Sequence, residues 1–110
     1  DTYGGKTPEE TLKLFVEALK KEDIELAAKY FMLDDNGSRE KWLDGLRHTK
    51  EANRLQEIAN ELETKAVPNP KDSVHEGDYK YVIYGENGMV DVVINMELNP
   101  YSQVWKIESL

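Results

Sequence analysis

The spacing of apolar residues changes once along this chain, and that change restricts the fold more than any other feature of the sequence. Up to Ala66 the apolar residues recur at helical intervals, and from Asp78 onward they alternate with polar residues, as in strands. Between the two parts, Pro68 and Pro70 exclude a regular helix and allow only edge strand or loop. Helices first and strands last predict an α+β fold. We expect N-terminal helices packed on a curved antiparallel sheet of three to four strands formed by the C-terminal half.

The first helical stretch, from Thr7 to Lys20, has both a start signal and an apolar stripe. Thr7 is a favourable N-cap, Pro8 suits the first helical position, and Glu10 completes a capping box. The stripe follows helical spacing and consists of Leu12, Phe15, Val16 and Leu19. We expect this helix to lie across the apolar face of the sheet.

The rest of the N-terminal half predicts further helices. Asp23 can cap a second helix. Its apolar stripe consists of Ile24, Ala27, Ala28 and Phe31. The next helical stretch runs from Ser38 to Leu62, either as one long helix or as two segments with a bend near His48. We favour two segments, the second of which Thr49 could cap.

The alternating part predicts three strands joined by short turns. They cover Asp78–Tyr84, Met89–Leu98 and Gln103–Ser109. In the middle strand the residues expected on one face are Val90, Val92, Ile94, Met96 and Leu98. A fourth strand could come from either Lys65–Val67 or Ser73–His75.

Charge and composition exclude several classes of function. The chain has 110 residues, of which 39% are hydrophobic and 33% charged, and its formal net charge is −8. We expect one domain over residues 7–110, after a flexible lead-in at residues 1–6. An acidic chain argues against nucleic acid, whose phosphates need a basic face. No apolar run approaches the roughly 20 residues of a membrane helix, so we expect no direct membrane insertion by this segment.

Both ends of the chain resemble the nuclear-transport-factor-2-like (cystatin-like α+β) superfamily. The opening, residues 7–31, reads TPEETLKLFVEALKKEDIELAAKYF, and the close, residues 104–110, reads VWKIESL. The resemblance implies a cone of helices against a curved sheet, with a homodimer through the sheet as the natural assembly. It is strongest to uncharacterised bacterial domains of secreted or lipid-anchored proteins, which implies an extracytoplasmic location. Enzymes of the superfamily place strands between their early helices, whereas this pattern stays helical to Ala66, so no catalytic residue is carried over.

The leading hypothesis is a non-enzymatic accessory or binding domain that holds a small ligand or a protein partner. Aromatic side chains can line a pocket for an apolar ligand, although in a small α+β domain they usually fill the core. The candidate ligand contacts are Tyr30, Trp42, Tyr81, Asp91 and Asn95.

Two other hypotheses remain open. One is a small cofactor-free isomerase or dehydratase in which Asp91 and a tyrosine, Tyr79 or Tyr81, transfer a proton. Burial would raise the pKa of the Asp91 carboxyl and make it a suitable general base, so this hypothesis requires a buried Asp91. The other is a structural spacer, which expects a cone filled by side chains.

Metal and cofactor chemistry have weak signals. His48 and His75 lie too far apart in the sequence for a ligand motif, and the absence of cysteine excludes thiolate sites. The segment Asp34–Ser38 superficially resembles a calcium loop but does not meet the full ligand spacing. A turn followed by a helix cap explains it better. We therefore expect no metal and no cofactor.

Overall fold

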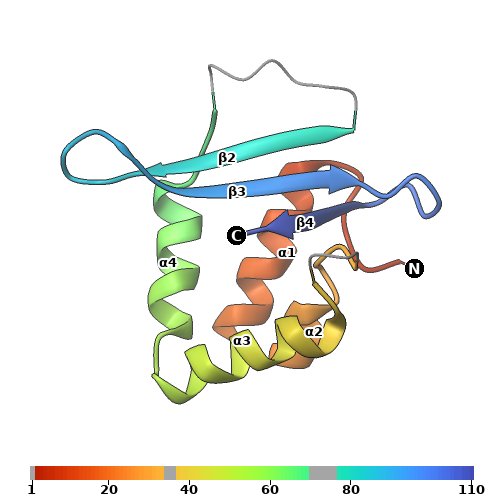
Figure 1. Cartoon of the computed structure of the whole chain (residues 1–110), viewed down its shortest axis with the longest axis horizontal. Coiled ribbons are helices and arrows are strands. Elements are labelled where there is room, and N and C mark those ends of the chain that lie inside the picture. Colours follow the sequence, from red (N-terminus) through yellow and green to blue (C-terminus); the bar gives the residue numbers. More distant parts are fainter. Residues whose placement is uncertain (1, 34–36, 70–76) are drawn as a thin grey trace.

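The computed structural model describes residues 2–33, 37–69 and 77–110, and these form an α+β fold as the change of period predicts (Figure 1). The helices in these ranges are α1 (Pro8–Lys20), α2 (Ile24–Ala28), α3 (Arg39–Glu51) and α4 (Leu55–Lys65). The strands are β1 (Val67–Pro68), β2 (Asp78–Tyr84), β3 (Val90–Leu98) and β4 (Trp105–Ser109). They form one antiparallel sheet in the order β1-β2-β3-β4.

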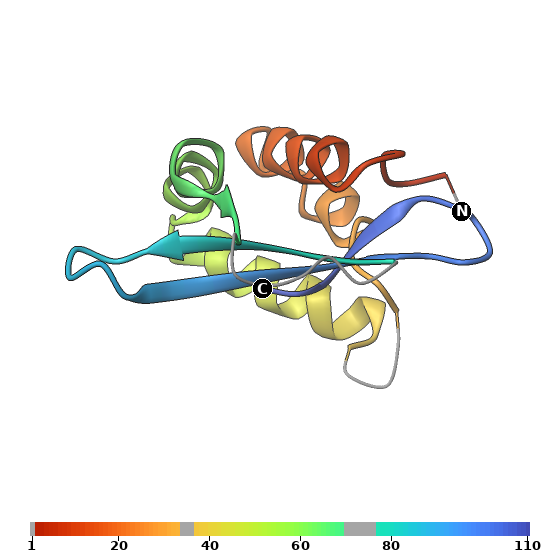
Figure 2. The ribbon, with the colours of Figure 1, turned by 90° about the horizontal axis from the view of Figure 1, so that it is seen from above.

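Helix α1 begins where the sequence predicts and buries the stripe that the sequence predicts. The Glu10 amide donates to the Thr7 hydroxyl at 3.1 Å, which satisfies one of the free amides of the first turn. Figure 2 shows α1 and α4 side by side over one face of the sheet. Helix α1 packs against β4, and α4 packs against β2. The first helix therefore covers one side of the apolar face rather than all of it.

Helix α2 is shorter than its predicted stripe. It ends at Ala28, and the following residues run beside β4 as an extra edge segment. The Ile107 amide donates to the Tyr30 carbonyl at 2.8 Å, and the Met32 amide donates to the Ile107 carbonyl at 2.7 Å. Phe31 is therefore buried but is not part of the helix, because its backbone lies against the edge of the sheet.

The long helical stretch is divided into α3 and α4, as predicted, but the break comes later than His48. It lies at residues 52–54, where Asn53 adopts the left-handed conformation with φ 61°. Asparagine tolerates this conformation better than most residues. The Thr49 hydroxyl does not cap α4; it donates to the Gly45 carbonyl, 2.9 Å away, within α3.

The sheet follows the predicted pattern with small shifts. β2 has the predicted bounds, β3 begins one residue late and β4 two residues late. Val67–Pro68 is the additional strand and overlaps the first of the two expected positions, Lys65–Val67, at Val67; the second, residues 73–75, lies outside the described residues. A register shift at Ile83/Tyr84 leaves Val90 exposed, whereas Ile94 and Met96 face the core.

The segment before α1 is attached to the sheet, where the sequence predicts a flexible lead-in. The Gly5 amide donates to the Thr11 hydroxyl at 2.8 Å, and that hydroxyl donates to the Trp105 carbonyl at 2.9 Å. The Trp105 amide in turn donates to the Gly5 carbonyl at 3.0 Å. These bonds make residues near Gly5 part of the fold.

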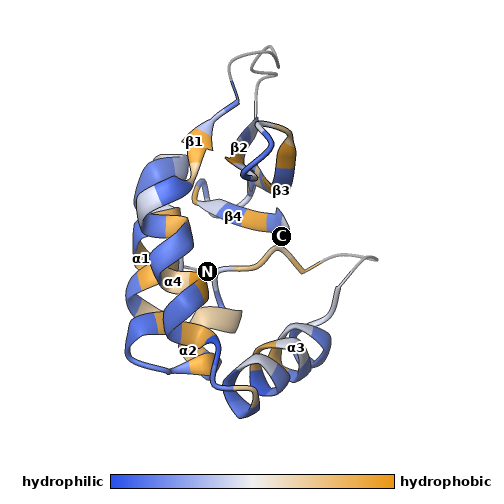
Figure 3. Ribbon diagram, turned by 90° about the vertical axis from the view of Figure 1, so that its left-hand side faces the viewer, coloured by the Kyte–Doolittle hydropathy of each residue, from blue (hydrophilic) through white to orange (hydrophobic). Residues whose placement is uncertain are grey.

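Hydrophilic residues cover most of the outer surface of α1, α3 and α4 (Figure 3). This is the well-solvated exterior that a net charge of −8 indicates. Within residues 2–33, 37–69 and 77–110, no helix has the length and apolar character needed to cross a membrane.

Candidate functional site

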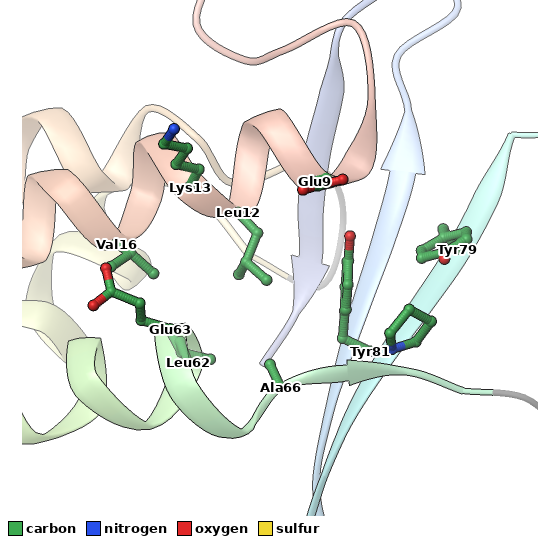
Figure 4. A pocket seen from close by; sticks show the side chains of 10 residues that line it. Glu9, Leu12, Lys13, Val16, Leu62, Glu63, Ala66, Tyr79 and Tyr81 are labelled. Carbon is green, nitrogen blue, oxygen red and sulfur yellow. The ribbon is translucent and has the colours of Figure 1, made fainter.

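An open pocket of about 480 Å³ lies between α1, α4 and the β1–β2 side of the sheet (Figure 4). We call it the α1–α4 groove. Its lining residues are Glu9, Leu12, Lys13, Val16, Leu62, Glu63, Ala66, Pro68, Tyr79 and Tyr81. Its volume is within the range of small-molecule sites, which begins at about 300 Å³.

Helix and strand periodicity bring these side chains together. On α1, Glu9, Lys13 and Val16 are spaced at i, i+4 and i+7, so they share one face of the helix. On β2, Tyr79 and Tyr81 are two residues apart and therefore point to the same face of the sheet. Their rings meet edge to face, with centroids 5.2 Å apart. The groove thus has one helical wall and one aromatic wall.

The groove is apolar at its floor and charged at its rim. The buried floor consists of Leu12, Val16, Leu62 and Tyr81. Glu9, Lys13 and Glu63 are exposed at the rim. The Glu63 carboxylate pairs with the Lys20 ammonium at 2.5 Å, whereas Glu9 and Lys13 form no ion pair or hydrogen bond with any other side chain in the described ranges.

The Tyr81 hydroxyl is a neutral donor in this groove. Burial first, and then the neighbouring Tyr79 and the Glu9 carboxylate, together raise the pKa of Tyr81 to about 12. Figure 4 shows the hydroxyl pointing to the end of the groove where Glu9 lies. No protein group in the described part of the chain hydrogen-bonds to it. A ligand in the groove would therefore meet an unused donor beside an unused carboxylate.

Of the five predicted ligand contacts, Tyr81 lines the groove and four do not. Tyr30 is buried elsewhere, edge-on to Tyr3 with ring centroids 6.4 Å apart. Trp42 stacks on Phe31 with ring centroids 4.1 Å apart. Tyr30 is therefore part of the core and the partly buried Trp42 packs against it, as aromatic residues of a small α+β domain usually do.

Asp91 and Asn95 lie on the opposite face of the sheet from the groove. The Asn95 amide donates to the Ser109 hydroxyl at 2.6 Å. Asp91 is exposed, because the strand alternation and the register shift next to it turn its side chain toward solvent. The isomerase or dehydratase hypothesis requires a buried Asp91, and this requirement is not met. Tyr81 pairs across the ladder with Ile94 on the inner face, so Asp91 and Tyr81 cannot act on one substrate.

In the described ranges, no group of three or more His, Asp or Glu side chains could hold a metal ion. His48 is exposed on α3. His75 and the acidic part of the calcium-loop resemblance, residues 34–36, lie outside the described residues.

Most residues of the groove are not found by sequence reasoning. Glu9 and Lys13 resemble the solvated face of a helix, and Ala66 and Pro68 resemble the end of a helix. The one sequence feature that points to the helical wall of the groove is the i, i+4, i+7 spacing of Glu9, Lys13 and Val16, next to the buried stripe of α1. That spacing identifies a helix face but does not show that α4 leaves a space next to it.

No protein-family model matches the chain, and no curated protein or solved structure is significantly similar to it. Membership of the nuclear-transport-factor-2-like superfamily therefore stays a prediction from the two ends of the sequence.

Proposed function

We propose that this chain is a non-enzymatic binding domain and that it holds a small ligand in the α1–α4 groove. The observation that supports the proposal is the combination of an open volume of about 480 Å³, an apolar floor and unused polar groups at its edge. Because these polar groups make no hydrogen bond or ion pair within the described ranges, they are available to fix the orientation of a ligand. A spacer domain would be expected to fill this space with side chains.

The test fills the groove and compares the result with a matched substitution elsewhere. Ala66 lines the groove and follows α4, and Ala52 follows α3 on an exposed surface. Ala66→Trp should place an indole in the groove, whereas Ala52→Trp should leave the groove open. A fragment library is screened by saturation-transfer NMR against the natural protein and both variants.

We expect the natural protein and Ala52→Trp to share a set of bound fragments that Ala66→Trp loses. If Ala66→Trp keeps those fragments, the binding site is not the groove. If the natural protein binds no fragment, the proposal of a small-molecule site fails.

We also propose a protein partner, a second copy of the chain, on the outer face of the sheet. A row of three paired valines crosses three strands on this face: Val67, Val82 and Val93. Val82 is buried, whereas Val67 and Val93 are exposed by 40% and 38%. Tyr84 and Val90 pair beside this row and are exposed as well. Exposed apolar side chains on one sheet face support an interface there.

The cellular location of the proposed domain rests on the sequence alone. From the resemblance of its two ends we propose an extracytoplasmic domain of a secreted or lipid-anchored bacterial protein. Expression of a full-length precursor with a C-terminal reporter, followed by cell fractionation, tests this location; recovery of the reporter from the cytoplasm would contradict it.

A further inference from the structure

Two polar groups that have no partner among the described residues lie at the same end of the α1–α4 groove. The Tyr81 hydroxyl points from the sheet toward this end, and the Glu9 side chain lies there on the first turn of α1 (Figure 4). The two groups interact electrostatically, because the negative charge of Glu9 raises the pKa of Tyr81. The protonated hydroxyl is a donor and the carboxylate is only an acceptor. A ligand that satisfies both must accept one hydrogen bond and donate another.

The remaining rim charges do not favour a charged ligand. Glu63 is neutralised by Lys20. The Lys13 side chain is directed away from Tyr81 in Figure 4, so its ammonium is not aimed at the end where the two polar groups lie. Of the three charged rim residues, Glu9 and Lys13 remain without an ion pair in the described ranges. They lie four residues apart on α1 and have opposite charges, so the rim has no net charge that favours an anion or a cation.

The floor of the groove disfavours a charged ligand further. Leu12, Val16 and Leu62 are buried side chains with no polar atom. A charged group placed over such a surface loses hydration without a matching partner, whereas a neutral hydroxyl loses far less. The apolar part of a ligand gains from contact with this floor and with the tyrosine rings.

We propose that the ligand of the α1–α4 groove is a neutral apolar alcohol or phenol. Its hydroxyl accepts a hydrogen bond from Tyr81 and donates one to the Glu9 carboxylate, while its apolar body rests on Leu12, Val16 and Leu62. This inference rests on the proposed function, since it names the ligand class of the same groove.

Charged analogues satisfy only one of the two groups. A carboxylate accepts from Tyr81 but is repelled by Glu9 and cannot donate to it. An ammonium group pairs with Glu9 but has no lone pair for the Tyr81 donor. A hydrocarbon leaves both groups without a partner.

The test uses four probes that share a 4-ethylphenyl group and differ in the substituent opposite the ethyl group: 4-ethylphenol, 4-ethylbenzoate, 4-ethylbenzylammonium and 4-ethyltoluene. Each is titrated at pH 7 into ¹⁵N-labelled protein and followed by amide chemical shifts. The proteins are the natural chain, Tyr81→Phe and Tyr84→Phe. Tyr84 lies on the same strand, is exposed and does not line the groove, so it is the matched control.

We expect 4-ethylphenol to bind the natural chain about tenfold more tightly than each other probe. Two hydrogen bonds separate it from 4-ethyltoluene, and one hydrogen bond separates it from each charged probe, which also loses hydration over the apolar floor. Tyr81→Phe should weaken 4-ethylphenol about three- to tenfold, with little effect on 4-ethyltoluene, and Tyr84→Phe should weaken neither. The amide spectra of both variants also show whether they are folded.

The failures are distinguishable. If none of the probes shifts amides of α1, α4 and β2, the proposed function fails together with the ligand class. If 4-ethylbenzoate, 4-ethylbenzylammonium or 4-ethyltoluene binds the groove as tightly as 4-ethylphenol, the site stands and the ligand class is wrong. If Tyr81→Phe binds 4-ethylphenol as the natural chain does, the assigned role of Tyr81 is wrong.

Discussion

Lys106 on β4 is a charged side chain of which only 2% is exposed. Its ammonium donates to the backbone carbonyls of Tyr3 and Lys29, and so connects β4 with the N-terminal segment and with the end of α2. Buried ammonium groups are rare unless their donors are satisfied in this way. Burial first, and then the charge of Arg39, lower the pKa of Lys106 to about 8.

This lowered pKa makes stability depend on pH. In the unfolded chain a lysine has a pKa of about 10.4, so between pH 8 and pH 10 the unfolded state binds more protons than the folded state. The Lys106 contribution therefore raises the free energy of unfolding as pH rises. Relative to Lys106→Met, the natural protein should gain on the order of 2 kcal/mol between pH 7 and pH 9.5.

Urea denaturation of both proteins at the two pH values measures this difference, and the comparison removes groups that titrate in both chains. A difference between the two proteins that stays constant or falls with pH would show that the Lys106 pKa is not lowered.

At the scale of elements, the junction between α3 and α4 depends on one left-handed residue. Asn53 has φ 61°, a conformation that costs alanine more than asparagine and glycine least. We therefore expect Asn53→Ala to lower the free energy of unfolding by about 1 kcal/mol, and Asn53→Gly to change it by less than about 0.5 kcal/mol.

Thermal or urea unfolding of the two variants checks this expectation. Ala52, the preceding residue, has an ordinary helical conformation, so Ala52→Gly should destabilise while Asn53→Gly does not. Equal losses from both glycine substitutions would contradict a special role of position 53.

The elements that could be predicted from the sequence are those with a local cause. The Thr7 cap, the α1 stripe and β2 depend on neighbours in the sequence, and the structure has all three. The end of α2 could not be predicted, because residues after Ala28 are drawn into contact with β4, far along the chain. The register shift in β3 and the attachment of Gly5 also depend on distant partners.

For the groove, sequence reasoning found Tyr81 but few of the residues around it. Two-residue alternation implies that Tyr79 and Tyr81 share one face of β2, and in the structure their rings meet there. Alternation alone could not decide which face of β3 would be covered, so it left both a buried and an exposed Asp91 open, and the structure has it exposed. The space itself depends on how far α4 stands from α1, which no local pattern encodes.

At the scale of the whole molecule, the proposed dimer through the outer face can be tested by changing the valine row, of which the two outer members, Val67 and Val93, are exposed. Val93 lies at one end of that row, and a lysine there would place a charge in the interface. We expect sedimentation velocity to show a dimer for the natural chain, with at least tenfold weaker association for Val93→Lys.

Leu33→Lys is the matched control, because Leu33 is similarly exposed but lies outside β1–β4. It should leave the association unchanged. Because the chain carries a charge of −8, the measurement belongs at moderate salt, where repulsion between copies is screened. A monomer at every concentration, or equal effects of the two lysines, would contradict the proposed interface.

Intermolecular nuclear Overhauser effects between a bound probe and the protein show whether the α1–α4 groove is a ligand site. With 4-ethylphenol in excess, we expect contacts from its ethyl group to the methyl groups of Leu12, Val16 and Leu62, which form the groove floor. Contacts to Val67 and Val93 on the outer face instead, or no contact to the floor, would contradict the claim.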